Sequence, residues 1–202
     1  MERTKKVYAF DFDGTLTKKD TLLAFIRYAK GDGKTFLGAL LFSPILLLMK
    51  LHLYPNWKAK QQVFSYFFKG MEIGDFNDLC RRFANDNRHL LRPGGQKVIR
   101  DALVEGSDVV IISASIENWV RPFFDEPWGE KIRTECTRID VRNDIVTGKF
   151  LTKNCYGSEK LKRLQKLYPY RNTYELIAFG DTRGDKQLLE YADKRHYKPF
   201  RK

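Results

Sequence analysis

Two aspartates one residue apart are the part of the sequence best suited to chemistry. Asp11 and Asp13 stand in VYAFDFDGTLTKKD, residues 7–20, directly after a short apolar run. Burying a carboxylate costs free energy unless a cation or several hydrogen bonds compensate its charge. The stretch therefore predicts a cation-binding site at the end of a buried strand, although a DxD pattern alone is a weak signal.

Three further polar segments follow the aspartate pair. Ser113 ends an apolar run at residues 108–113, Lys160 opens an amphipathic pattern in GSEKLKRL, and Asp181 and Asp185 lie in GDTRGD. Phosphoryl transfer requires an in-line nucleophile, neutralisation of charge and protonation of the leaving group. Carboxylates, a lysine and a hydroxyl together offer these functions.

As a set, these segments resemble the four motifs of the haloacid dehalogenase superfamily of aspartyl phosphohydrolases. Those motifs are DxD(G/S)T, a strand-terminal Ser or Thr, a Lys, and GDxxxD, and the match spans the whole chain. The resemblance implies that Asp11 is a nucleophile that forms an aspartyl-phosphate. Asp13 would protonate the leaving alcohol and then act as the base toward water.

The resemblance also implies Mg²⁺, because a carboxylate that attacks a phosphate dianion needs its repulsion cancelled. The expected metal residues are the Asp11 side chain, the Asp13 carbonyl and Asp181, with Asp185 close by or bridged through water. The expected activity is therefore Mg²⁺-dependent hydrolysis of a phosphomonoester.

Two further residues would bind phosphate oxygens. Ser113 would do so together with backbone amides after its strand, and Lys160 would neutralise charge on Asp11 and the phosphoryl group. Lys153 and Lys162 are near Lys160 in the sequence, but Lys160 has the position that opens the helix.

The elements that must position these residues alternate between strand and helix. Short apolar runs predict strands at residues 7–12, 108–113 and 176–180, with shorter candidates at 132–139 and 195–198. Helical patterns lie between them at residues 98–103, 161–168 and 188–192. This alternation predicts an α/β fold, a doubly wound Rossmann-like parallel sheet whose ligands bind at the carboxyl ends of the strands.

Residues between the first and second strands do not read as strand. Apolar spacing predicts helices at residues 57–68 and 76–84. We expect an inserted all-helical cap at residues 18–88, and a catalytic core formed by residues 1–17 and 89–202.

The cap is similar to that of the phosphoserine phosphatase subgroup, with three departures. Asp20 stands where that subgroup has a Glu that contacts the substrate amine, Gly14 replaces Ser, and residues 113–115 are Ser-Ala-Ser instead of Ser-Gly-Gly. Asp20 is a candidate substrate residue on this basis. The departures predict that phosphoserine is a poor substrate.

An apolar segment in the cap allows two interpretations. Residues 35–49 contain no charge, are flanked by Lys34 and Lys50, and include Pro44. The run is shorter than the ~20 residues that span a bilayer. It is either a buried cap helix or an interfacial segment, residues 36–49, that places the active site on an anionic membrane surface.

The second interpretation follows from a similarity to the phosphatidylglycerophosphatase C family. That family has the same order of motifs, an apolar proline-containing segment early in the cap, and a stretch like FFDEPW at residues 123–128. The similarity implies an amphiphilic or lipid phosphate as substrate, such as phosphatidylglycerophosphate. The alternative is a soluble small-metabolite phosphatase.

Composition agrees with an anionic partner. The 202 residues include 37 Lys and Arg against 25 Asp and Glu, a formal net charge of +12. No nucleic-acid-binding signature is present, so nucleic acid is not expected as a partner. The cysteines (Cys80, Cys136 and Cys155) lack metal-ligand spacing and fit buried, reduced thiols, which predicts a cytoplasmic protein, peripheral at the inner membrane face if it binds lipid.

Other classes of protein fit the residues less well. A non-catalytic phosphate-binding module would not need Asp13 and Asp181 together, and a dehalogenase would not need Asp13. A phosphomutase stays open on the motifs alone.

Overall fold

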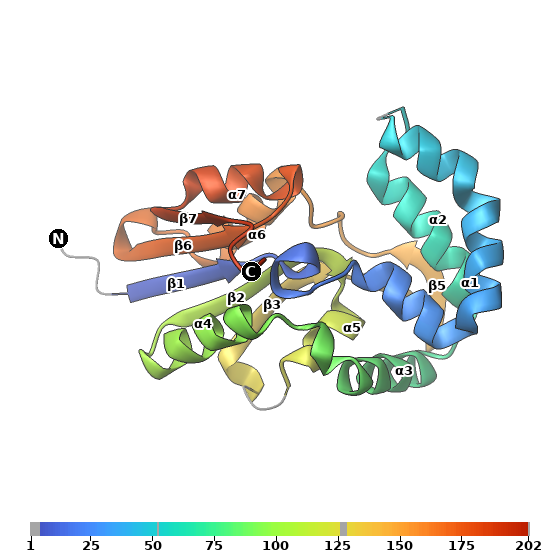
Figure 1. Cartoon of the computed structure of the whole chain (residues 1–202), viewed down its shortest axis with the longest axis horizontal. Coiled ribbons are helices and arrows are strands. Elements are labelled where there is room, and N and C mark those ends of the chain that lie inside the picture. Colours follow the sequence, from blue (N-terminus) through green and yellow to red (C-terminus); the bar gives the residue numbers. More distant parts are fainter. Residues whose placement is uncertain (1–4, 52, 126–128, 202) are drawn as a thin grey trace.

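The computed structural model describes residues 5–51, 53–125 and 129–201, and its centre is a parallel sheet (Figure 1). Within the described residues this sheet has five strands in the order β3-β2-β1-β6-β7. The strands are β1 (Lys5–Phe10), β2 (Asp108–Ile116), β3 (Ile132–Thr137), β6 (Tyr174–Gly180) and β7 (Lys194–Tyr197). Every neighbouring pair is parallel, which confirms the α/β fold class expected from the sequence.

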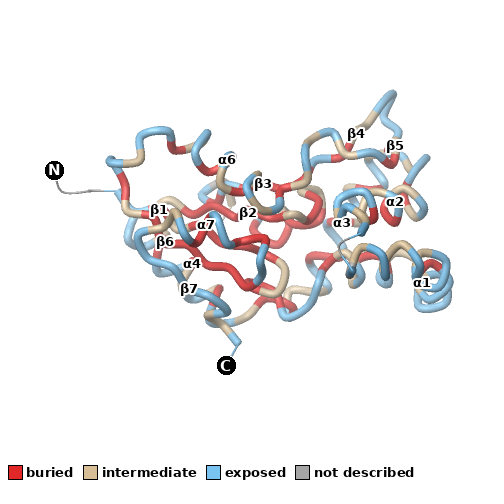
Figure 2. Tube along the Cα trace, turned by 90° about the horizontal axis from the view of Figure 1, so that it is seen from above, coloured by how far each residue is buried: buried red, intermediate tan, exposed pale blue. Residues whose placement is uncertain are grey.

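The central strands β1, β2 and β6 are covered on both faces, which explains why they are apolar without clear alternation, whereas the edge strand β7 is exposed. One face buries Phe10, Ile111 and Phe179 in a cluster that includes Ile99 of helix α4 (Pro93–Val104). The other face buries Ala9 and its neighbours against α6 (Ser158–Leu167) and α7 (Lys186–Tyr191). Figure 2 shows many of the buried residues gathered along the central strands of the sheet.

Of the α-helices between β1 and β2, three lie at the other end of the molecule from the sheet (Figure 1). They are α1 (Thr21–Lys50), α2 (Asn56–Phe68) and α3 (Ile73–Asp86). The remaining helical pieces are short: α5 (Glu117–Val120) and the single turns η1 (Phe12–Leu16), η2 (Arg88–Leu90), η3 (Arg121–Phe123), η4 (Gly129–Lys131), η5 (Arg171–Thr173) and η6 (Arg183–Asp185).

A small antiparallel hairpin also packs on α2, which the sequence did not predict. It consists of β4 (Ile139–Arg142) and β5 (Ile145–Phe150), so the strand expected at residues 132–139 ends at Thr137. The Phe150 amide donates to Gln61 Oε1 at 2.9 Å, and the Gly70 amide donates to the Val146 carbonyl at 2.9 Å. A segment from the second half of the chain therefore supports the inserted helices.

Helix α1 is two helical segments joined at Gly31, whose backbone (φ 78°, ψ 169°) is not helical. The first segment buries one side: Phe25 contacts the rings of Phe68, Phe83 and Trp119, at centroid distances of 5.2, 5.2 and 4.9 Å. This aromatic cluster joins the inserted helices to α5, which follows β2 in the chain. Aromatic packing of this kind contributes free energy beyond the buried area alone.

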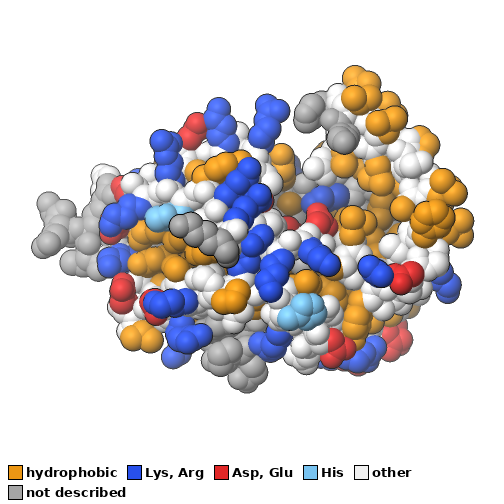
Figure 3. All heavy atoms as spheres, viewed as in Figure 1, with side chains coloured by type: hydrophobic (Ala, Val, Ile, Leu, Met, Phe, Trp, Pro, Cys, Tyr) orange, Lys and Arg blue, Asp and Glu red, His pale blue; other side chains and the backbone are white. Residues whose placement is uncertain are grey.

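The second segment of α1 is exposed, so the interpretation of residues 35–49 as a buried cap helix is wrong. Phe36 is 73% exposed and Leu40 is 61% exposed. We call the following residues the exposed apolar face: Phe36, Leu37, Leu40, Leu41, Leu47 and Leu48 of α1, with Leu51, Leu53 and Trp57 beyond it. Figure 3 shows hydrophobic side chains gathered over this end of the molecule.

The structure also describes the cysteines and part of the FFDEPW stretch at residues 123–128. All three cysteines are free and buried, as expected. Phe123 and Phe124 are buried and contact the Phe12 ring at 5.4 and 5.8 Å, which makes that part of the stretch core packing. Residues 126–128 lie outside the described residues.

Two phenylalanines of α1 give a matched test of this fold. We expect Phe25→Ala to lower the free energy of unfolding by about 3–5 kcal/mol, because it leaves a cavity among buried rings. Phe36→Ala should change it by less than about 0.5 kcal/mol, since the side chain is mostly exposed. Urea unfolding of the two variants measures the difference, and equal losses would contradict the placement of α1.

Candidate active site

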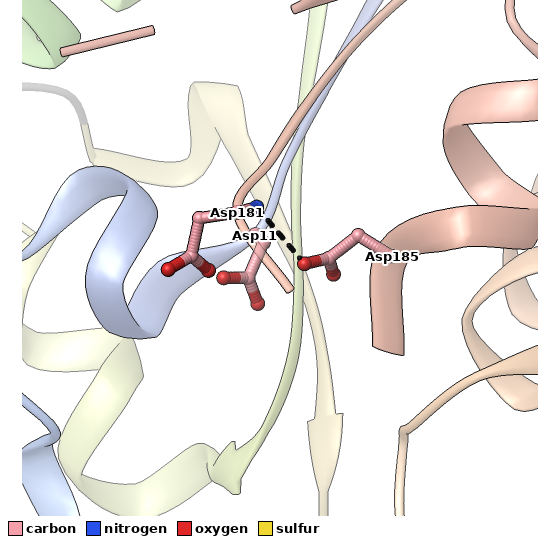
Figure 4. A group of neighbouring side chains, drawn as sticks. All are labelled: Asp11, Asp181 and Asp185. Atoms are coloured by element: carbon pink, nitrogen blue, oxygen red, sulfur yellow. Dashed lines mark hydrogen bonds between the residues drawn. The ribbon is translucent and has the colours of Figure 1, made fainter. Parts of the chain in front are cut away.

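The sequence-predicted acidic residues converge at the carboxyl edge of the sheet. Asp11 follows β1 and Asp181 follows the neighbouring strand β6, while Asp185 lies in the turn before α7. Figure 4 shows these carboxylates turned toward one another. One oxygen from each lies within 4.8 Å of the others, and all three residues are buried.

Gly14 explains why the chain can turn so tightly after Asp13. Its backbone has φ +79°, a conformation that residues with a Cβ seldom adopt. A Cβ at this position would stand 2.5 Å from Asp181 Oδ2. The glycine of the DxDGT segment is therefore required both for the turn and for the approach of β6.

Asp185 is held by protein donors on both carboxylate oxygens. Its Oδ2 accepts from the Asp181 amide at 3.1 Å and from the Thr182 amide and hydroxyl at 3.0 and 3.1 Å, and its Oδ1 accepts from Lys160 at 2.6 Å. Three of these hydrogen bonds fall on Oδ2 and one on Oδ1, so Oδ2 is fully occupied by protein donors. Asp185 is thus placed to orient the loop that carries Asp181 and to hold Lys160.

Lys160 is the buried cation of the site. Its ammonium group donates to Asp11 Oδ1 and to Asp185 Oδ1, and the side chain is 3% exposed. Burial lowers the pKa of Lys160, but the charges of Asp11 and Asp185 outweigh this effect and raise the pKa above its ordinary value. The pKa of Asp185 is lowered: burial opposes ionisation, and Lys160 with the amide hydrogen bonds overcomes it.

Asp11 differs from Asp185 in having few donors. Desolvation raises its pKa to about 7, although Lys160 acts in the opposite direction. The fold therefore buries more negative charge here than Lys160 compensates. A divalent cation would supply the missing charge.

Asp13 lies on the other side of the turn and is oriented by two hydroxyl residues that the sequence reasoning missed. Its Oδ1 accepts from the Thr21 amide at 2.8 Å and the Thr21 hydroxyl at 2.7 Å, and its Oδ2 accepts from Ser115. Burial raises the pKa of Asp13 and the charge of Asp20 adds to this, while Ser115, Thr21 and Lys60 oppose the shift. The result is a carboxyl group that retains its proton more readily than a solvated aspartate.

Ser113 lies near the carboxyl end of β2 and is buried, in the place expected from the sequence. Its hydroxyl oxygen accepts from the Ser115 amide at 3.0 Å.

Asp20, the candidate substrate residue, caps helix α1: its Oδ1 accepts from the Leu22 and Leu23 amides at 2.9 and 3.4 Å. Asp20 also lines the cavity described below, so its expected contact with substrate stays a prediction.

Arg201 is the second cation of the site, and no motif pointed to it. Its guanidinium donates to Asp181 Oδ2 at 2.6 Å. The preceding residue, Phe200, anchors the segment: its ring stacks on Phe179 at 5.6 Å and its carbonyl accepts from Arg92 at 3.1 Å. A single arginine 20 residues from Asp181 has no spacing signal in the sequence.

A cavity of about 540 Å³ opens beside these residues. Its walls come from the sheet edge at one end and from α1 and α2 at the other. The sheet-edge residues include Asp11, Asp13, Ser113, Lys160 and Asp181. The helical walls are mostly apolar: Leu22, Leu23, Ile26, Ala39, Phe42, Leu46, Met49, Val63 and Phe67.

The acidic cluster fits Mg²⁺. Hard divalent cations prefer carboxylate oxygens, and Asp11, Asp181 and Asp185 bring such atoms together in a buried place. Asp185 Oδ2 accepts from three protein donors, so its capacity for a metal lies on Oδ1, which accepts from Lys160. Mg²⁺ would neutralise the charge of Asp11 toward an incoming phosphate.

This sheet and the residues at its edge define a hydrolase of the haloacid dehalogenase type. The chain belongs to that family: the sequence profile of haloacid dehalogenase-like hydrolases matches residues 8–190. It is 32% identical over 195 residues to Protein CicA of Caulobacter vibrioides. The aligned region covers 96% of this chain and 86% of CicA.

Two solved structures support the fold. A protein of unknown function from Bordetella pertussis Tohama I has a TM-score of 0.81 at 17% identity, with 95% of this chain and 89% of that chain covered. A phospho-aspartyl intermediate analogue of phosphoserine phosphatase has a TM-score of 0.61 at 19% identity, with 95% and 85% covered. Similarity to a phosphoserine-phosphatase-like fold was expected from the sequence and is confirmed.

The raised pKa of Asp11 predicts a pH-dependent stability in metal-free protein. Below about pH 7 the folded chain protonates Asp11, whereas the unfolded chain does so only near pH 4. Asp11 therefore contributes stability as the pH falls from 7 to 4, and its buried charge is destabilising above pH 7. We expect Asp11→Asn to raise the melting temperature in EDTA by several degrees more at pH 8 than at pH 5.

Excess Mg²⁺ is the control for this comparison. It should reduce the advantage of Asp11→Asn at pH 8, because the metal compensates the wild-type carboxylate. A difference in melting temperature that is constant from pH 5 to pH 8 would contradict the assignment of the pKa shift to Asp11.

Proposed function

We propose that this protein is a Mg²⁺-dependent phosphomonoester hydrolase that works through an aspartyl-phosphate on Asp11 and acts on an amphiphilic phosphate. The observation that carries the proposal is the cavity that joins the Asp11, Asp13, Lys160 and Asp181 cluster to apolar walls of α1 and α2. A phosphate group suits one end of this cavity, and an apolar group suits the other.

The proposed chemistry assigns one role to each side chain. An oxygen of Asp11 forms a bond to phosphorus as the ester P–O bond breaks, and Asp13 gives its proton to the leaving oxygen. Water then attacks phosphorus, its proton passes to Asp13, and the bond to Asp11 breaks to release inorganic phosphate. The raised pKa of Asp13 suits a general acid, and Thr21 and Ser115 hold its carboxyl group in place.

Charge neutralisation completes the proposed site. Mg²⁺, held by Asp11 and Asp181 and by the Asp13 carbonyl, would reduce repulsion between the nucleophile and the phosphate dianion. Lys160 adds a fixed positive charge beside Asp11, and Ser113 lies in the cavity wall, where its hydroxyl can reach phosphate oxygens. In this proposal residues 1–17 and 89–202 form the catalytic core and residues 18–88 form the cap.

Substitutions of Asp11 and Asp13 test the different roles proposed for these two carboxylates. Asp11→Asn should abolish turnover and labelling of the enzyme by phosphate. Asp13→Asn should lower kcat by roughly 10²–10⁴-fold on alkyl phosphates. The loss should be much smaller on p-nitrophenyl phosphate, whose leaving group needs little protonation.

Excess EDTA should stop wild-type turnover, and added Mg²⁺ should restore it. Turnover of the Asp11→Asn variant at the wild-type rate would contradict the assignment of Asp11 as the nucleophile. Full activity in EDTA would remove the metal from the reaction.

The lipid part of the proposal is supported by the exposed apolar face. An 18-residue window within Thr21–Met49 reaches a mean hydropathy of 1.4, and 6% of this window is buried. Large exposed apolar surfaces on soluble proteins usually mark an interaction site. The net charge of +12 favours an anionic bilayer as the occupant, with the protein peripheral on the cytoplasmic side.

A pair of lysine substitutions tests this surface. Leu41→Lys with Leu47→Lys should weaken binding to anionic vesicles, by up to about a hundredfold for side chains that reach hydrocarbon. The rate on p-nitrophenyl phosphate should stay near that of the wild type, because both leucines are exposed (56% and 58%) and neither lines the cavity that holds the carboxylates.

The matched control adds the same charge elsewhere. Val104 and Leu151 are also exposed apolar residues, 83% and 65%, outside the exposed apolar face. Val104→Lys with Leu151→Lys should preserve or increase vesicle binding. Wild-type protein that does not bind anionic vesicles at low salt would leave the alternative, a soluble small-metabolite phosphatase like the phosphoserine phosphatases.

A further inference from the structure

Arg201 makes an ion pair that none of the proposed chemical steps uses. Its guanidinium donates to Asp181 Oδ2 at 2.6 Å, and the Asp181 side chain is 6% exposed, whereas that of Arg201 is 44% exposed. The other carboxylate oxygen of Asp181 accepts from the Thr15 hydroxyl at 3.3 Å. Both oxygens of this expected metal ligand therefore have a protein donor, and one of the donors carries a positive charge.

The segment that carries Arg201 is attached to the catalytic core at several points. The Lys198 amide donates to the Gly180 carbonyl at 2.8 Å, at the end of β6. The Phe200 carbonyl accepts from Arg92 Nη1 at 3.1 Å. A side chain of Phe200 also fits closely at the start of α4, where a Cβ added to the second glycine of that helix would stand 3.4 Å from the ring. The guanidinium thus reaches the sheet edge from an anchored segment.

A metal ion that binds Asp181 would meet the guanidinium on the same carboxylate. Hard divalent cations bind carboxylate oxygens directly. Two cations on one carboxylate repel each other, and this repulsion is weakly screened because the Asp181 side chain is buried. Arg201 therefore opposes metal binding, whereas in metal-free protein it compensates the charge of Asp181.

The surroundings of Arg201 favour a role at the metal rather than at the substrate. An arginine beside a phosphatase site could instead bind phosphate oxygens. However, the described residues that line the cavity include Asp181 and Thr182 but not Arg201. Arg201 also lies beyond residues 8–190, the part of the chain that matches the family profile. Its contact with Asp181 is therefore a feature of this chain outside the shared motifs.

We propose that Arg201 is a positioning residue of the metal site: it holds Asp181 in metal-free protein, and it leaves Oδ2 when Mg²⁺ binds. The inference rests on the proposed function in one respect, because it takes Asp181 as a metal ligand. The exposure of Arg201 permits this exchange, since a guanidinium at the surface regains contacts with water when it leaves the carboxylate. The affinity for Mg²⁺ is then set in part by a residue that contributes no ligand.

Calorimetric titration of Mg²⁺ measures the exchange without substrate. Arg201→Gln should lower the Kd for Mg²⁺ by roughly tenfold, because the competing charge is removed. In EDTA the same variant should melt several degrees below the wild type, since the buried carboxylate of Asp181 loses its cation. Saturating Mg²⁺ should remove most of this difference. Arg201→Lys should lie closer to the wild type in both measurements, because it keeps the positive charge.

Arg195→Gln is the matched control. Arg195 is an exposed arginine of β7 that forms no ion pair with a described residue. Its substitution should leave both the Kd for Mg²⁺ and the melting temperature in EDTA unchanged, which separates the ion pair from the loss of net charge.

A residue that only stabilises the fold would give the opposite sign. Unchanged or weaker Mg²⁺ binding by Arg201→Gln would overturn the proposal. So would an unchanged Kd for Mg²⁺ together with a raised KM for p-nitrophenyl phosphate, which would assign Arg201 to the phosphate.

Binding and turnover together separate this inference from the proposed function. Tighter Mg²⁺ binding by Arg201→Gln, with no hydrolysis of phosphomonoesters by the wild type, would refute the phosphatase and retain the exchange. Equal Mg²⁺ affinities of the variant and an active wild-type enzyme would refute the exchange alone.

Discussion

The buried ion pairs of Lys160 are the interaction on which the rest of the site depends. Lys160 comes from α6, Asp11 from the end of β1, and Asp185 from the turn before α7, so one ammonium group joins three elements. A buried charge without its partner would be strongly destabilising. The sheet order brings these elements together, because β1 and β6 are neighbours and their carboxyl ends meet. The fold and the charge pattern therefore constrain each other.

The same geometry leaves a surplus of negative charge around Asp11. Asp185 is satisfied by protein donors, whereas Asp11 is not, and the pKa values of the two carboxyl groups move in opposite directions for that reason. Arg201 supplies part of the compensation at Asp181. What remains is a buried position with free carboxylate oxygens, which is the environment that a hard cation requires.

The sequence predicted the site residues that belong to recognisable motifs, but it did not predict the residues that orient their side chains. Strand ends gave the positions of Asp11, Ser113 and Asp181, because parallel strands place their carboxyl ends at one edge. Thr21 and Arg201 could not be found in this way, since a hydroxyl at the start of a helix or one arginine among many has no diagnostic spacing. The exposure of α1 was equally unpredictable: hydropathy marks residues 35–49 as apolar but does not say what covers them.

Helix α1 links the catalytic end of the molecule to its apolar end. Its first residue, Thr21, holds the Asp13 carboxyl group, and Phe25, one turn later, anchors this segment among buried rings. Beyond Gly31 the helix changes direction, and its second segment presents one side to the cavity and the other to solvent. The break thus separates the segment that contacts Asp13 from the segment that carries the exposed apolar face. A contact of the exposed apolar face with another surface therefore involves residues other than Thr21, which holds the Asp13 carboxyl group.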